Sequence, residues 1–138
     1  MNEKWSRWTP REGLDKRYKI KSVFDGEKGL SILLSAEQNE MHGIQVLFGF
    51  SASAHRTTYE TFRHALIISL NQKYGSDFYT QWTFFNIENS SYIQWLREQS
   101  EGMSDFEHYQ HFAFLTADLF LDVLAMKEPE ISDIRFPI

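Results

Sequence analysis

One stretch of the chain, Phe78–Trp95, constrains the fold most, because it concentrates the bulky side chains that a core needs. It contains seven Phe, Tyr and Trp residues within a chain whose aromatic fraction is 16%. Within it, Gln81–Ile87 is apolar on both alternating faces, which predicts a central strand that is covered on both sides. Ser91 and Gln94 have the spacing of a capping box and predict a helix that ends before Gly102. The stretch therefore predicts a buried strand leading into a helix.

Three runs of alternating apolar and polar residues precede this stretch, and alternation of this kind predicts half-buried strands. They are Tyr18–Asp25, Leu30–Ala36 and Ile44–Ser51. Their connections are too short for parallel crossovers, so an antiparallel meander is expected. A helix over residues 58–74 is predicted next, because apolar residues recur at helical spacing after a Thr57–Glu60 capping box and before Gly75.

The segment of residues 109–126 is compatible with two structures. Read as strands, Gln110–Thr116 and Leu119–Leu124 form a hairpin around Ala117-Asp118. Read as a helix, the apolar residues between Leu115 and Leu124 form an acceptable stripe. The Phe, Leu and Val content favours the hairpin, as does a sheet that needs more strands.

The two ends of the chain are predicted to be irregular. Residues 1–16 are expected to form an arm that Trp5 and Trp8 pin to the body, and residues 127–138 an irregular tail marked by two prolines. The element order is then β-β-β-α-β-α-β-β. This order predicts a single α+β domain over residues 1–138, with an antiparallel sheet of about five to six strands and two helices packed on one face.

Composition excludes several classes of protein. Cysteine is absent, which rules out a disulfide scaffold, a thiolate nucleophile and a cysteine-based zinc site. No apolar run has the length of a signal peptide core or a transmembrane helix. We therefore expect a cytoplasmic protein without a membrane partner. The net charge of −5 disfavours nucleic acid as a partner and suits a basic protein.

Four residues carry the alternative of a small enzyme or a ligand-binding or metal-binding domain: His55, Arg56, His108 and His111. His108 and His111 share a face on a helix but face opposite ways on a strand. His55-Arg56 lies where a predicted strand meets a predicted helix, a place that attracts anions, but no glycine-rich loop accompanies the pair.

Ser90-Ser91 is better explained as a helix cap than as a nucleophile, because no GxSxG motif is present. No motif for a cofactor or a metal ion is found, so neither is expected. The sequence favours a role without catalysis over an enzyme.

One face of the predicted sheet has the composition of an interface. If the helices cover the side of Ile32 and Val46, the opposite side shows an apolar stripe within a polar surround. The stripe is predicted to contain Val23, Leu33, Leu47 and Phe85. A face of this kind meets a partner or a second copy of the chain, or is covered by the chain's own ends. The sequence leaves these possibilities open.

Two parts of the sequence resemble a known group of proteins. One is His111–Asp118 with Leu121–Ala125 and Glu128–Ile131, and the other is Tyr74–Tyr79 followed by Trp82–Phe85. Together they resemble small, uncharacterised bacterial cytosolic proteins encoded near contact-dependent toxin loci, some of them immunity proteins. The resemblance covers about residues 55–131 and its motifs are structural, so no functional residue is carried over. It implies a stoichiometric inhibitor that binds a toxin.

For an interaction protein of this type, we predict an acidic edge that faces a basic partner. Its predicted members are Asp118, Asp122, Glu128 and Glu130. Charges of this kind act chiefly on association rate and selectivity. A homodimer is a further possibility.

Overall fold

The computed structural model describes residues 2–102 and 107–137. The strands of this part are β1 (Lys4–Arg7), β2 (Tyr18–Gly26), β3 (Gly29–Ala36), β4 (His42–Gly49), β5 (Ala52–Tyr59), β6 (Phe84–Glu88), β7 (Gln110–Leu115), β8 (Leu119–Ala125) and β9 (Glu130–Arg135). A 3-10 turn, η1 (Glu60–Arg63), leads into helix α1 (His64–Tyr74), and helix α2 (Ser91–Gln99) follows β6.

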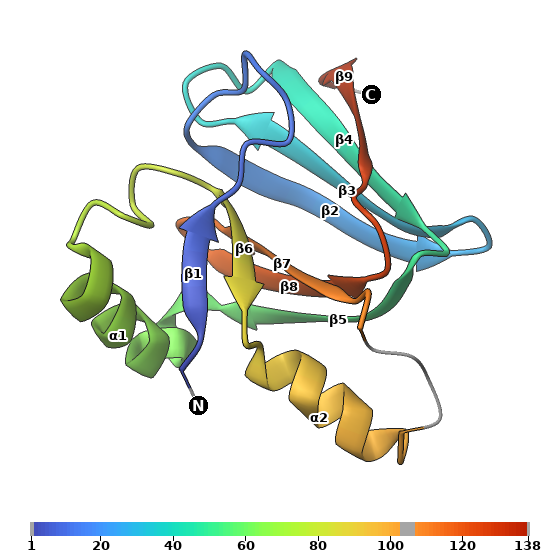
Figure 1. Cartoon of the computed structure of the whole chain (residues 1–138). Helices are drawn as coiled ribbons and strands as arrows, with labels where there is room; N and C mark the ends of the chain where they lie inside the picture. Colours follow the sequence, from blue (N-terminus) through green and yellow to red (C-terminus); the bar gives the residue numbers. More distant parts are fainter. Residues whose placement is uncertain (1, 103–106, 138) are drawn as a thin grey trace.

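The strands form two antiparallel sheets that pack against each other (Figure 1). One sheet has the order β1-β6-β7-β8-β5, and the other has the order β2-β3-β4-β9. Within the described residues, the chain passes between the sheets three times, from β1 to β2, from β4 to β5 and from β8 to β9. The Met126 amide donates to the Ser51 carbonyl at this corner (3.0 Å), so the β5–β8 ladder continues toward the β4–β9 ladder. This bent ribbon joins the two sheets.

The main core lies between the sheets. Strand alternation turns Phe84, Phe112 and Phe114 inward, where they pack with residues such as Ile32 and Val46 of the four-stranded sheet. These side chains are fully buried, and each contributes roughly 1.5–3 kcal/mol of transfer free energy. The aromatic strand predicted from the sequence is thus an interior strand, β6, between β1 and β7.

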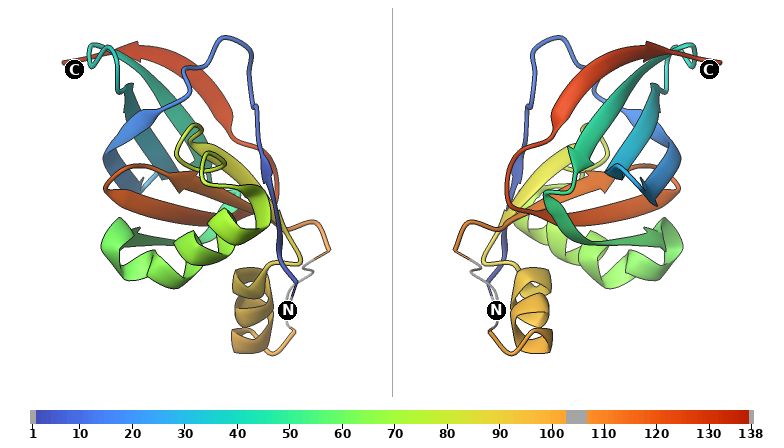
Figure 2. Two further views of the ribbon diagram at one scale, coloured as in Figure 1. Left: turned by 90° about the vertical axis from the view of Figure 1, so that its left-hand side faces the viewer. Right: turned by 90° about the vertical axis from the view of Figure 1, so that its right-hand side faces the viewer.

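A second, smaller core covers the other side of the five-stranded sheet. Phe85 and Phe120 point outward and pack under Leu70 and its neighbours on α1. Helix α2 lies beside the same sheet and buries Tyr92. Both helices therefore lie on the side of the molecule away from the four-stranded sheet, as the turned views of Figure 2 show.

The α+β class, the meander of β2, β3 and β4 and the hairpin of β7 and β8 are confirmed. The expectation of a single sheet is wrong, since the meander pairs with β9 and the hairpin with β5 and β6. The side of Ile32 and Val46 is covered by the second sheet and not by helices.

The predicted helix over residues 58–74 begins too early. Thr57 lies in β5 and pairs with Leu121, and α1 begins only at His64. No side chain caps the 3-10 turn that follows Tyr59. The Thr57–Glu60 capping box is therefore wrong, because pairing with β8 outweighs the local signal. Gly75 does end α1, with φ of 92°.

The predictions of an irregular arm and an irregular tail are also wrong. Residues 4–7 form β1, which pairs with β6, and residues 130–135 form β9, which pairs with β4. Trp5 and Trp8 are buried, as expected. They anchor β1 and the residue after it to the two cores, Trp5 on the helix side and Trp8 between the sheets. Among the described residues, no helix is long and apolar enough to cross a membrane.

Candidate functional site

A line of polar side chains crosses the helix side of the five-stranded sheet. The Ser90 hydroxyl lies 2.7 Å from Nδ1 of His111, and Nε2 of His111 lies 2.7 Å from Oδ1 of Asp122. The second carboxylate oxygen of Asp122 accepts from Arg56 Nε (2.9 Å) and Arg63 Nη1 (3.0 Å). We call these five residues the polar relay. They come from five different elements or their ends.

Strand register explains why these side chains meet. Asp122 on β8 pairs with Arg56 on β5 and with Ala113 on β7. His111 lies two residues before Ala113, so all three strands present these residues on one face. Arg63 reaches Asp122 from the end of η1, and Ser90 reaches His111 from the start of α2. The relay thus ties both helical segments to the sheet.

Asp122 is the anionic centre of the relay, and its side chain is only 1% exposed. Burial by itself raises the pKa of this carboxyl, but the hydrogen bond and charge of His111 and the charges of Arg56 and Arg63 outweigh burial. The net result is a pKa of Asp122 well below its ordinary value. Asp122 is therefore ionised at neutral pH, and a buried carboxylate with hydrogen-bond donors on both oxygens is well satisfied.

The ionised carboxylate fixes the tautomer of His111. A carboxylate only accepts hydrogen bonds, so Nε2 of His111 carries a proton and donates to Asp122. In the neutral form of the imidazole, Nδ1 then carries no proton. Nδ1 of His111 then accepts from the Ser90 hydroxyl. The result is a directed chain of hydrogen bonds from Ser90 through His111 to Asp122.

Helix α2 is joined to the relay at its first turn. Ser90 is its N-cap, and the Ser90 hydroxyl accepts from the Ile93 amide (3.0 Å). The Arg56 guanidinium lies over the Tyr92 ring, 4.1 Å from its centroid, a cation–π contact. Burial raises the pKa of Tyr92; the charge of Arg56 lowers this pKa and the charge of Asp122 raises it, both to a smaller extent. This ring closes the relay from the α2 side.

The structure brings together only two of the four residues of the enzymatic alternative, Arg56 and His111. The third, His55, lies on β5, and its Nε2 is 3.3 Å from Oδ2 of Asp25. The fourth, His108, is exposed and precedes β7. Within residues 2–102 and 107–137, no group of three or more His, Cys, Asp or Glu side chains could hold a metal ion.

The predicted acidic edge does not form one surface. Asp122 is buried in the relay and cannot face a partner. Asp118 precedes β8 and Glu128 follows it, so the length of the strand, about 23 Å, separates them. Glu128 accepts from Trp8 Nε1 (3.2 Å). Glu130 begins β9 and is exposed. The four charges expected to act together are therefore distributed over the two ends of β8, its buried middle and the start of β9.

The side of the four-stranded sheet that points away from the other sheet is a second candidate site. We call it the open face. Alternation and register place Phe24, Ser31, Leu33, Gln45, Leu47, Glu130 and Ser132 on it. Leu33 and Leu47 thus face outward as predicted. Val23 instead packs toward the core between the sheets, and Phe85 belongs to the other sheet.

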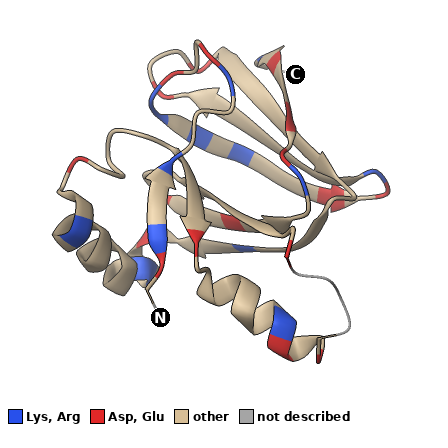
Figure 3. Cartoon of the chain, in the orientation of Figure 1, with Lys and Arg blue, Asp and Glu red and all other residues tan. Residues whose placement is uncertain are grey.

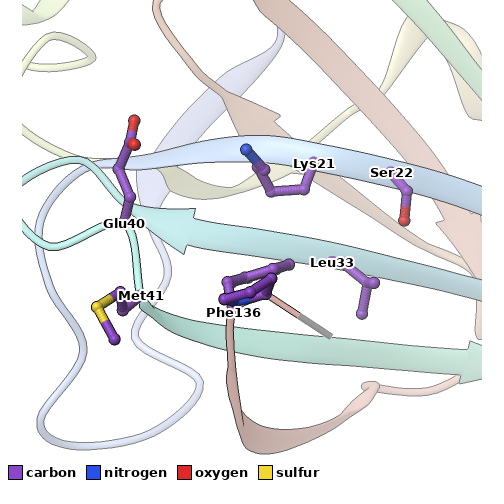
Figure 4. A pocket seen from close by; sticks show the side chains of 7 residues that line it. Lys21, Ser22, Leu33, Glu40, Met41 and Phe136 are labelled. Carbon is purple, nitrogen blue, oxygen red and sulfur yellow. The ribbon is translucent and has the colours of Figure 1, made fainter.

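A groove of about 520 Å³ lies on the open face. It is lined by Lys21, Ser22, Leu33, Glu40, Met41, Phe136 and Pro137. Figure 4 shows the Phe136 ring between Met41 and Leu33, and Lys21 Nζ lies 5.9 Å from the centre of this ring. The end of the chain therefore covers part of the open face and forms one wall of the groove.

Sequence reasoning missed Ser90, Arg63 and Tyr92 as members of one site, because they come together only through the sheet register. One signal was available. An acidic residue inside the apolar run of β8 needs a buried partner, and Asp122 is such a residue.

The chain was compared with known proteins. No family model, no curated protein and no solved structure matches it.

Proposed function

We propose that the protein is a cytoplasmic protein-interaction module that binds a basic partner protein through the open face. The observation that supports this most directly is the groove beside Leu33, on a sheet side that both helices leave uncovered. Apolar side chains within a polar surround are the usual composition of a reversible protein interface. An immunity-type inhibitor of a toxin is one module of this kind.

Charge defines the chemistry of the proposed partner. The chain has a net charge of −5, which steers positively charged proteins toward it. On the open face, Glu130 lies opposite Leu47 in the β4–β9 register. Glu40 lines the groove and already pairs with Lys19 (2.7 Å). In the view of Figure 3, acidic and basic segments are interspersed over this sheet. The proposed partner would therefore place an apolar side chain in the groove and a basic side chain opposite Glu130.

The experiment places a photo-crosslinking amino acid at position 33 and exposes the protein to native cell extract. We expect one basic protein to be captured, with the same partner then bound by purified wild type. Leu47→Asp should abolish this binding. Glu130→Lys should slow association, and more so at low salt, since it reverses a steering charge.

Phe62→Ser provides the matched control, because Phe62 is 77% exposed but lies in η1, away from the open face. This variant should bind like wild type. Crosslinks only between copies of the chain would identify a homodimer instead and refute the proposed partner. Capture that persists in Leu47→Asp would place the interface elsewhere.

A further inference from the structure

The polar relay has an order that is used for nucleophilic chemistry. A hydroxyl donates to one nitrogen of an imidazole whose other nitrogen donates to a buried carboxylate. Both contacts are 2.7 Å here, within the range needed for proton transfer. Among Ser90, His111 and Asp122, the exposed fraction of the residue falls from 7% to 2% and then to 1%. Of these three residues, Ser90 is the most exposed.

Two surface pockets lie beside Ser90. Ser90 lines a pocket of about 470 Å³ together with His111, and a neighbouring pocket of about 520 Å³ that does not include His111. Ile93 and Asn89 line both pockets. Ser90 and His111 therefore border the same pocket.

Charge that develops near Ser90 would meet a favourable field. Ser90 caps α2, and the Ile93 amide already points at the hydroxyl oxygen. The positive end of the helix dipole lies at this turn. Arg56 and Arg63 hold Asp122 from the other side, which keeps the carboxylate ionised and the imidazole oriented.

We propose that Ser90 is an acyl-accepting nucleophile, with His111 as its general base and Asp122 as the residue that orients the base. In the first step, the Ser90 oxygen bonds to the carbonyl carbon of an ester while its proton moves to Nδ1 of His111. The ester carbon–oxygen bond then breaks, and His111 returns the proton to the departing alcohol. Water attacks the acyl-serine in the same way and releases the carboxylic acid and the free hydroxyl.

The pockets select the class of ester. Among the described residues that line the pocket shared by Ser90 and His111, Glu88 is acidic and none is Lys or Arg, so an anionic acyl group would be repelled there. The neighbouring pocket is lined by both Arg97 and Glu107. The volumes of the two pockets suit a small molecule and not a polymer. The proposed substrates are therefore small, uncharged carboxylic esters. The relay lies on the helix side of the five-stranded sheet and the open face on the other sheet, so this activity is independent of the proposed partner binding.

The test uses a fluorophosphonate probe and 4-nitrophenyl acetate on the purified full chain. Wild type should be labelled at Ser90, as peptide mass spectrometry would show, and should release a burst of nitrophenol equal to the protein present. Ser90→Asp should remove both signals while keeping a helix cap. His111→Gln should slow labelling by about 100-fold or more.

Ser91→Ala is the matched control, since it changes the neighbouring hydroxyl and leaves Ser90 in place. It should be labelled at the wild-type rate. Circular dichroism and thermal unfolding would establish that each variant is folded. Labelling at another residue, hydrolysis that is the same in Ser90→Asp, or the absence of labelling in folded wild type would each overturn the proposal. None of these results tests whether the open face binds the proposed partner protein.

Discussion

Replacing Asp122 by Asn tests whether the polar relay stabilises the fold. Asn has the same shape, and its carbonyl oxygen can still accept from His111. Its NH₂ group, however, faces the two arginine donors that now contact Oδ2. Breaking a buried ion pair by changing one partner typically costs about 3–5 kcal/mol. Because the Arg56 side chain is 44% exposed, water relieves part of this loss, and we expect about 3 kcal/mol.

Urea denaturation followed by tryptophan fluorescence would measure the effect. With an m-value near 2 kcal/mol/M, the midpoint should fall by about 1.5 M. The exposed Asp118 offers a matched control, and Asp118→Asn should change stability by less than about 0.5 kcal/mol. If Asp122→Asn lowers the free energy of unfolding by less than about 1 kcal/mol, the ion pairs of the two arginines with this carboxylate do not stabilise the fold. That result would refute the reasoning.

The pH dependence of this loss has a defined sign. The pKa of Asp122 is lowered in the folded state, so its contribution is fully present above the ordinary carboxyl pKa of about 3.9. As pH falls below that value, the unfolded chain takes up a proton while the folded chain stays ionised, and the contribution is lost. The difference in the free energy of unfolding between wild type and Asp122→Asn should therefore be constant from pH 7 to about 5. It should become smaller below about pH 4.

Two further changes test other parts of the account. Arg17 Nη1 donates to the carbonyls of Tyr79, Trp82 and Leu115 (2.8–2.9 Å), so Arg17→Lys should cost about 2 kcal/mol in urea unfolding even though the charge is kept. An unchanged midpoint would show that these bonds are dispensable. Gly29 and Gly13 both have φ above 80°, but only at Gly29 would a Cβ meet backbone, 2.2 Å from the Gly49 carbonyl carbon. Gly29→Ala should therefore lower the melting temperature much more than Gly13→Ala, and equal effects would show that φ alone decides.

Elements with strong local patterns were predictable. The β7–β8 hairpin follows from two apolar runs around Ala117-Asp118, and the Ser90-Ser91 cap follows from its position before an amphipathic run. The structure confirms the hairpin and a serine cap, with the Ile93 amide donating to Ser90. The Ser91–Gln94 capping box is wrong, because Ser91 lies inside α2 and Ser90 is the N-cap. In these segments the periodicity, the turn and the tertiary environment all favour the same structure.

Strand β5 shows why other elements were not predictable. It contains few apolar residues, because Arg56 contacts the carboxylate of Asp122 and His55 contacts Asp25 of β2. Thr57 with Glu60 imitates a capping box, and only pairing with β8 shows that the segment is extended. The short strands β1 and β9 likewise depend on partners far away in the sequence, β6 and β4. Their pairing, and hence the second sheet, has no local signature.

The relay was only partly visible in the sequence for the same reason. His111 and Asp122 lie 11 positions apart on paired strands, so the hairpin prediction already placed them near each other. Arg56 and Ser90 join them through β5 and α2, neither of which the sequence could position in space. The sequence predicts one exposed acidic edge because exposure is the usual state of Asp and Glu. Asp122 departs from this rule because three cationic or donor groups surround it.

The most direct test of partner binding by the open face is hydroxyl-radical footprinting in native cell extract. Met41 and Trp95 are equally exposed, at 49% and 50%, but Met41 lines the groove and Trp95 lies on α2. We predict that Met41 is protected in extract and reactive in the purified protein, while Trp95 is modified equally in both. Equal modification of Met41 in extract and in purified protein would contradict the proposed role of the open face.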